Sequence, residues 1–268
     1  MDLLQRLRPE AIAVVDMQGM IGNAIRPLDC SRLLTRIRED ASIRAVVLNI
    51  DSPGGSATGS DLITRAVTRL RAEKPVIAFI GGLGASGGYM VAAATDGILA
   101  LPSALVGAIG VIAYRPLVAG ALERIGLQVR VAKSGRLKDM LSPFRESTEE
   151  ERTKEQHLID TLHTQFVEGV ARGRALPEAR VRELATGEVW VATDALEAGL
   201  IDRVGDIEDA IDWAAERSGA PRRVRLIRSR RSLRDVVMGR ASAVVAESLG
   251  VEFDSAAWRG PQALYDGR

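Results

Sequence analysis

The stretch VIAFIGGLGASGGYMVAAA, residues 76–94, decides the fold of this chain. It opens with five apolar residues that predict a buried strand over 76–80, and the glycines at 81 and 82 end that strand. The small and apolar residues that follow predict a helix over 86–94. A strand joined to a helix by a glycine-rich turn is a building unit of α/β proteins, and it sets the class to look for along the rest of the chain.

The same unit recurs on both sides of this stretch. The apolar patterns predict strands at 11–17, 44–50 and 97–100 and helices at 30–40 and 58–73. The strand at 44–50 stops at DSPGG, residues 51–55, which is a strong turn signal. Strands and helices that alternate at a spacing of about 30 residues predict an α/β fold with a largely parallel sheet.

The second half of the chain is more helical. Thr148 precedes three glutamates, and this pattern predicts a helix start because a hydroxyl caps the first turn and acids favour its positive end. The helix is expected to run to about residue 174. A short strand is expected at 129–132, a second helix after Pro177, and a strand, a helix and a turn over 187–213.

Arginines crowd the sequence after Pro221, with seven between residues 222 and 234. We therefore divide the chain into a main domain at 1–215 and an Arg-rich C-terminal extension at 216–268. The extension is expected to hold a strand at 224–227 and a helix near 232–249. We interpret it as a solvated helix with an assembly contact, and phosphate or lipid binding is the alternative.

The composition argues against several classes of partner and site. Lysines and arginines number 36 and acids 35, so there is no general attraction to nucleic acid or anionic membranes. Cys30 is the single cysteine, which excludes an internal disulfide and a four-cysteine zinc site. No apolar run approaches the ~18–20 residues of a membrane span or resembles a signal peptide. We expect a soluble, cytoplasmic protein without a transmembrane segment, and peripheral association with a membrane is the alternative.

Ser86 is the first candidate for chemistry. It lies in GASGGY, residues 84–89, at the predicted start of a helix, where unpaired backbone N–H groups can stabilise an oxyanion. Gly87 would supply the first such N–H, and the 51–55 loop at a neighbouring strand end would supply the second. The alternative interpretation is that Ser86 is a helix cap and that the glycines only form turns.

A serine needs a base, and the chain offers few candidates. Its two histidines, His157 and His163, lie six residues apart on the long helix and point to different faces, so we interpret them as surface or packing residues. This argues against a Ser-His-Asp triad and against a histidine metal site. A lysine can act as the base when its neutral form is favoured. KSGRLKD, residues 133–139, offers both Lys133 and Lys138, and these residues alone do not choose between them.

Taken together and in order, these motifs resemble the signal peptide peptidase A (protease IV) family, serine peptidase family S49. The resemblance covers roughly residues 10–215. It is carried by NIDSPGG (49–55), GASGGY (84–89), GAIGV (107–111), KSG with KD and SP (133–143), and GEVW with GLID (187–202).

The resemblance implies a site. It makes Ser86 the nucleophile and Lys138, 52 residues later, the general base. It assigns the oxyanion donors to Gly87 and to Gly55, with Gly54 as the alternative. Gly54, Tyr89 and Ser134 are expected along the substrate groove. No metal or organic cofactor is implied.

The resemblance also implies a ClpP/crotonase-like fold of repeated ββα units with a helical second half. It implies a homo-oligomer in which serine and lysine meet across a subunit boundary, since each motif occurs once here. Peptides are the expected substrates, including signal-peptide remnants. No counterpart of the family's N-terminal membrane anchor is expected.

Three rival interpretations share features of this sequence. A crotonase-type enzyme acting on acyl-CoA thioesters would use the same glycine N–H groups without a serine nucleophile or the 133–139 motif. A non-catalytic peptide-binding scaffold would keep the peptidase fold but would not hydrolyse peptides. A phage-type head-maturation protease would use the same chemistry on another substrate.

Overall fold

A mixed sheet forms the centre of the computed structural model, which describes residues 9–227. Within these residues the sheet has eight strands, and its main path runs β6-β5-β3-β2-β1-β8. Neighbouring strands are parallel except β5 and β6, which are antiparallel, while β4 joins β3 and carries β7. The strands are β1 (Ala11–Gln18), β2 (Ile43–Ser52), β3 (Val76–Ala85), β4 (Gly97–Ala100), β5 (Leu105–Gly107), β6 (Val189–Val191), β7 (Arg203–Val204) and β8 (Val224–Ile227).

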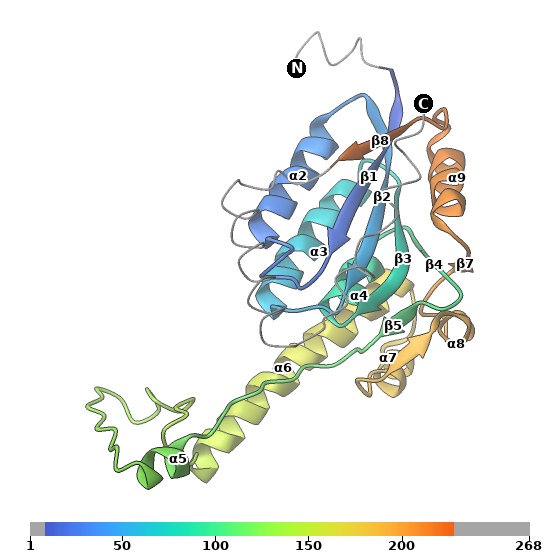
Figure 1. Cartoon of the computed structure of the whole chain (residues 1–268). Helices are drawn as coiled ribbons and strands as arrows, with labels where there is room; N and C mark the ends of the chain where they lie inside the picture. The colour runs from blue at the N-terminus through green and yellow to red at the C-terminus, as the bar shows by residue number, and fades with distance from the viewer. Residues whose placement is uncertain (1–8, 228–268) are drawn as a thin grey trace. The chain divides into compact units, whose positions relative to one another are not determined.

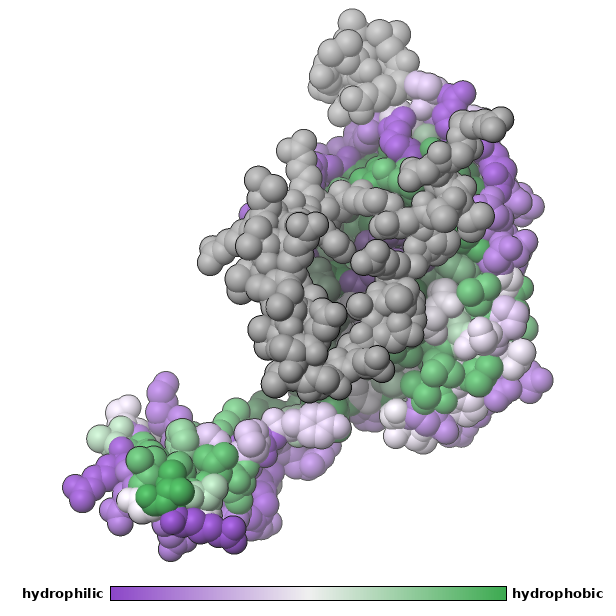
Figure 2. Space-filling view, viewed as in Figure 1, coloured by the Kyte–Doolittle hydropathy of each residue, from purple (hydrophilic) through white to green (hydrophobic). Residues whose placement is uncertain are grey.

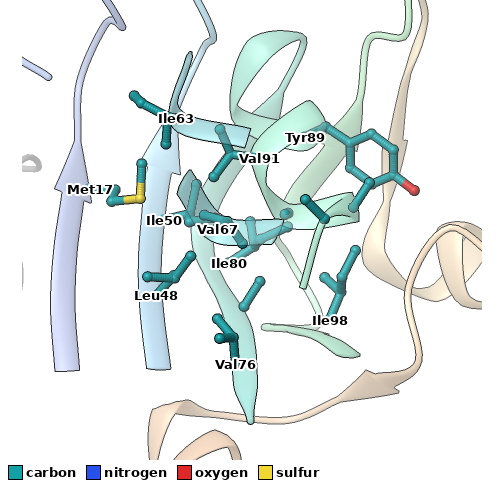
Figure 3. Packing of buried hydrophobic residues seen from close by; sticks show 14 of the residues in the cluster. Met17, Leu48, Ile50, Ile63, Val67, Val76, Ile80, Tyr89, Val91 and Ile98 are labelled. Carbon is teal, nitrogen blue, oxygen red and sulfur yellow. The ribbon is translucent and has the colours of Figure 1, made fainter. Parts of the chain in front are cut away.

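Helices cover both faces of this sheet, as Figure 1 shows. One face packs against α2 (Pro27–Glu39), α3 (Ala57–Arg71) and α4 (Gly87–Ala93), and the other packs against α9 (Ile207–Ser218). The central strands are apolar at nearly every position because both of their faces are buried, as is usual for parallel sheets. Figure 3 shows the first of these layers, in which Ile63 and Val67 of α3 lie over β2 and β3.

The remaining helices follow β5. A long segment containing α5 (Ala119–Arg124) leads into α6 (Glu149–Arg174), α7 (Glu178–Leu184) and α8 (Ala192–Glu197). We call residues 112–148 the arm. Phe166, Val167 and Val170 anchor the C-terminal half of α6 in the core, whereas Leu158 and Leu162 in its N-terminal half are exposed. Figure 1 shows α6 leading away from the sheet, with the arm beside its N-terminal end.

Most of the predicted elements are confirmed. The strands predicted at 11–17, 44–50, 97–100 and 224–227 are β1, β2, β4 and β8, and the helix predicted from Thr148 to about 174 is α6. β3 is longer than predicted, because residues 83–85 pair with β5 and Gly84 pairs with Ser52, so the glycines do not end the strand.

The strand predicted at 129–132 is wrong. These residues form no strand, and Val129 and Val131 are exposed. A strand needs a neighbouring strand to pair with, and the alternating pattern alone does not supply one. α5, β5, β7 and α9 were not predicted.

The C-terminal strand belongs to the main sheet, because β8 pairs in parallel with β1. The predicted domain boundary at residue 215 therefore falls inside α9, and the described residues belong to one compact unit. The helix predicted near 232–249 lies outside the described residues. Among residues 9–227, none of the helices combines the length and hydropathy that crossing a membrane requires.

Candidate active site

Ser86 occupies the tight turn between β3 and α4 with an unusual backbone conformation. Its φ of 50° and ψ of −121° lie in a region that costs a non-glycine residue about 1–3 kcal/mol. Its N–H donates to the Gly107 carbonyl at 2.8 Å, and its carbonyl accepts from Met90 N–H at 2.9 Å. These two hydrogen bonds hold the strained residue, which is half-buried. A serine on a sharp strand-to-helix turn is a geometry that suits an exposed nucleophile.

The N–H group of Gly87 lies at the start of α4. It belongs to the first turn of α4, where N–H groups have no acceptor within the helix. The space around it is tight, since a Cβ atom on Gly87 would lie 2.1 Å from Ser60 Oγ. Because Gly87 has no side chain, the start of α4 can lie this close to α3.

The loop after β2 lies directly against Ser86. A Cβ atom on Gly54 would lie 2.7 Å from both the Ser86 Cβ and the Gly87 nitrogen. The Gly54 N–H already donates to Ser52 Oγ at 3.2 Å, whereas in residues 9–227 we find no acceptor for the Gly55 N–H. Of the two glycines proposed from the sequence, Gly54 thus has its N–H paired within the chain.

Asp51 holds the backbone at the same edge of the sheet. The sequence did not indicate this role. Between β2 and β3 the register shifts at this residue, and the Asp51 carboxylate accepts a hydrogen bond from Leu83 N–H at 2.9 Å. Burial raises the pKa of this carboxyl group, and the hydrogen bond from Leu83 opposes that rise. Asp51 thus holds the bulged end of β3 that leads to Ser86.

Tyr89 is not a groove residue, so that assignment is wrong. Its side chain is fully buried, and its hydroxyl donates to the Leu200 carbonyl at 2.8 Å. Burial raises the pKa of the phenol well above its usual value. Figure 3 shows the Tyr89 ring within the core, three residues after Ser86 and therefore on the inner face of α4.

Lys138 lies in the arm and not beside Ser86. Its side chain is exposed, and no partner within residues 9–227 forms a hydrogen bond or ion pair with its amine. Ser134 is also exposed in the arm. In the described part of the chain, no hydrogen bond or ion pair joins the arm to the β3–α4 turn. One chain therefore brings Gly54 and Gly87 against Ser86, whereas Gly55 bridges to Ile21 and Lys138 lies in the arm.

Lys133 differs from Lys138 in its surroundings. Its amine donates to the Asp139 carboxylate at 2.5 Å and to the Arg136 carbonyl at 3.0 Å. The two histidines, His157 and His163, both lie on α6. Among the described residues, no group of three or more histidines, cysteines or acids is arranged to hold a metal ion.

Comparison with known proteins connects this geometry to a family. Residues 68–220, more than half of the chain, match the family described as Peptidase family S49. A protein of Methanocaldococcus jannaschii is 38% identical over 179 residues, which cover 67% of this chain and 58% of that protein. The chloroplastic serine protease SPPA of Arabidopsis thaliana is 32% identical over 252 residues, which cover 88% of this chain and 37% of that protein. The chain thus spans less than two thirds of these relatives.

A solved structure shares the fold. It is a mutant of the 1510-N membrane-bound stomatin-specific protease, and it matches with a TM-score of 0.51 at 16% identity, covering 82% of this chain and 99% of that one. At this identity the match concerns the fold alone. It confirms the expectation of an α/β, ClpP/crotonase-like architecture.

Proposed function

The chain belongs to peptidase family S49, and from this premise we propose that it is a serine endopeptidase with Ser86 as nucleophile and Lys138 of a neighbouring copy as general base. The observation that carries the proposal is the backbone of Ser86. It is held in a strained conformation at the head of α4, beside two glycine-rich loops. A serine that only capped a helix would not need this conformation.

The chemistry follows from the positions of these groups. Neutral Lys138 takes the proton from Ser86 Oγ, and the oxygen attacks the scissile carbonyl of the peptide. The N–H groups of Gly87 and Gly55 stabilise the negative oxygen of the tetrahedral intermediate. Lys138 then donates its proton to the leaving amine, and water releases the acyl group from Ser86. The lysine must be neutral for the first step, which a desolvated, assembled site favours.

A neighbouring copy is needed because the arm places Lys138 away from its own Ser86. The arm and the start of α6 also carry an apolar surface of the kind that protein partners cover. Figure 2 shows part of it as a green patch on the arm. The exposed apolar residues in this region are Ile112, Tyr114, Leu117, Ile125, Leu127, Val129, Val131, Leu141, Phe144, Leu158 and Leu162. We propose that they pack against another copy in a homo-oligomer.

The proposed substrates are peptides in an extended conformation that pair with a strand edge next to Ser86. Short peptides such as signal-peptide remnants fit the family to which the chain belongs. A crotonase-type thioester enzyme would use the same glycine N–H groups but would have no use for the strained Ser86.

The test uses two single variants of the full chain. Ser86→Ala and Lys138→Ala should each reduce peptide hydrolysis by at least ~10³-fold, because each removes a group that acts in the same chemical step. A fluorophosphonate probe should label Ser86 in the parent protein and should label neither variant.

Matched controls are Ser103→Ala and Lys154→Ala, which change exposed residues outside the proposed site and should leave hydrolysis unchanged. Near-normal hydrolysis by either test variant, with its fold intact by circular dichroism, would refute the dyad. Thioester turnover without probe labelling would favour the crotonase-type alternative.

A further inference from the structure

Four charged side chains surround the turn that carries Lys138, and they form one continuous network. Lys133 donates to Asp139, Asp139 accepts from Arg145, and Arg145 donates to Glu151. We call these four residues the ionic clamp. The clamp connects the extended part of the arm, the Lys138 turn and the first turn of α6, which follow one another along the chain.

Glu151 anchors the clamp to α6. Its side chain is only 3% exposed, and it accepts hydrogen bonds from Arg145 Nη1 at 2.8 Å and Nη2 at 2.5 Å. It also accepts from Thr148 N–H at 2.9 Å, and Thr148 Oγ1 in turn accepts from Glu151 N–H, which completes a capping box. The hydrogen bonds from Arg145, followed by those from Thr148, lower the pKa of Glu151 to about 2.

Asp139 joins Arg145 to Lys133 in the clamp. It accepts from Arg145 Nε at 3.0 Å and from Lys133 Nζ at 2.5 Å, and these bonds, Arg145 first, hold its pKa well below the usual range. The turn itself is closed by backbone hydrogen bonds, including Lys138 N–H to the Gly135 carbonyl at 3.1 Å. The backbone around Lys138 is therefore fixed, whereas its amine has no partner within the described chain.

We propose that the ionic clamp positions the general base. Lys133 and Arg145 hold the Asp139 carboxylate, so that it does not bind the adjacent Lys138, and the turn presents a free amine to the neighbouring copy. This inference rests on the proposed function, and it gives Lys133 a positioning role. It also explains why two lysines so close in sequence have different tasks.

The charges around the turn determine the direction in which each substitution should move the pH profile. The charged groups on the turn and the preceding segment are Lys133, Arg136 and Asp139. Those on the segments packed against it are Arg115, Arg145, Glu150 and Glu151, and Arg115 donates to the Met140 carbonyl and pairs with Glu155. Arg136 pairs with Glu150 outside the clamp. Removing a clamp cation frees Asp139 to stabilise the protonated form of Lys138, whereas removing Asp139 takes that carboxylate away.

The experiment measures kcat, KM and the pH profile of kcat/KM for the full chain and its variants. Arg145→Gln should lower kcat by ~10–100-fold with little change in KM, because it misplaces the base without touching substrate. It should also move the acid limb of the profile to higher pH by about half a unit or more. Asp139→Asn should move that limb in the opposite direction. The control Arg152→Gln breaks an exposed pair with Glu149 at the same helix end and should change neither quantity.

The outcomes separate the clamp from the proposed function. If Lys138→Ala keeps its activity, the proposed function fails and the clamp fails with it. If Lys138→Ala is inactive while both Arg145→Gln and Lys133→Gln match the parent in kcat and in pH profile, only the clamp is wrong. Should Arg145→Gln fail to fold or assemble, Lys133→Gln decides, because it leaves the Arg145–Glu151 pair intact. An unmoved acid limb in that variant overturns the proposal.

Discussion

Ser86 lies where three backbone segments meet. Each segment has a glycine at this point, and a Cβ atom on that glycine would lie less than 3 Å from a neighbouring atom. Gly54 lies against its Cβ atom, Gly107 accepts its N–H, and Gly87 follows it at the start of α4. Ser60 of α3 lies beneath Gly87. The strain at Ser86 persists because these contacts fix it, which is the situation expected at a reactive residue.

A pair of substitutions tests this packing at the scale of single residues. Gly87→Ala places a methyl group 2.1 Å from Ser60 Oγ and should lower kcat/KM by ~10²-fold, because the helix start and its N–H groups must shift. Adding Ser60→Ala removes that oxygen and leaves the Ser60 Cβ at 3.1 Å as the nearest other atom of that side chain, so the double variant should recover part of the activity.

Ser60→Ala alone is the control and should behave like the parent, since within residues 9–227 its hydroxyl donates to the carbonyl of Ser56, the N-cap of α3. The contradicting result is strict additivity of the two substitutions, because residues in contact should show a coupling of about 0.5–3 kcal/mol.

At the scale of elements, local signals in the sequence were enough for much of the fold. The apolar runs of β1, β2 and β4 and the capped start of α6 were predicted at nearly their observed positions. The failures come from long-range pairing. β3 continues past Gly81 and Gly82 because residues 83–85 pair with β5 and Gly84 pairs with Ser52 of β2. Residues 129–132 form no strand, because no strand pairs with them in the described chain.

The same limit applies to the candidate site. The glycine-rich motifs around Ser86 could be found from sequence, since small residues next to a serine are a local signal. The contacts of Asp51 with Leu83 and of Ser60 with Gly87 join residues about 30 positions apart, and no local pattern reports them. Tyr89 was misassigned because its assignment rested on its place in the motif. Its position on the helix, which directs the side chain into the core, was not considered.

The N-terminal end of α6 should respond to acid. The pKa of Glu151 is lowered from 4.5 to about 2 in the folded chain, so its bonds stabilise the folded state fully above about pH 4.5. That stabilisation is lost as the pH falls from there toward 2. We therefore expect the amides of residues 145–151 to lose hydrogen-exchange protection in this range before those of β1–β3.

Glu151→Gln is the matched control for this prediction, because its amide does not titrate in that range. Protection factors for residues 145–151 should then show little dependence on pH between 4.5 and 2. If the parent protein keeps the same protection across this range relative to β1–β3, or if the variant loses protection as the parent does, the role assigned to Glu151 is wrong.

At the scale of the whole molecule, the described chain separates the two halves of the proposed chemistry. The β3–α4 turn provides Ser86 and the Gly87 N–H, and the arm provides Lys138 on a turn fixed by the ionic clamp. The apolar residues of the arm and of the start of α6 have no cover within residues 9–227. An assembly in which each arm reaches the serine of a neighbour would satisfy both observations.

Co-expression of the Ser86→Ala and Lys138→Ala chains tests this claim most directly. Each variant alone should be inactive. Mixed assemblies, verified by native mass spectrometry, should recover roughly a quarter of the parent activity, because one site in four draws an intact serine from one copy and an intact lysine from its neighbour. Mixed assemblies that show no hydrolysis while the parent protein is active would contradict a dyad shared between copies.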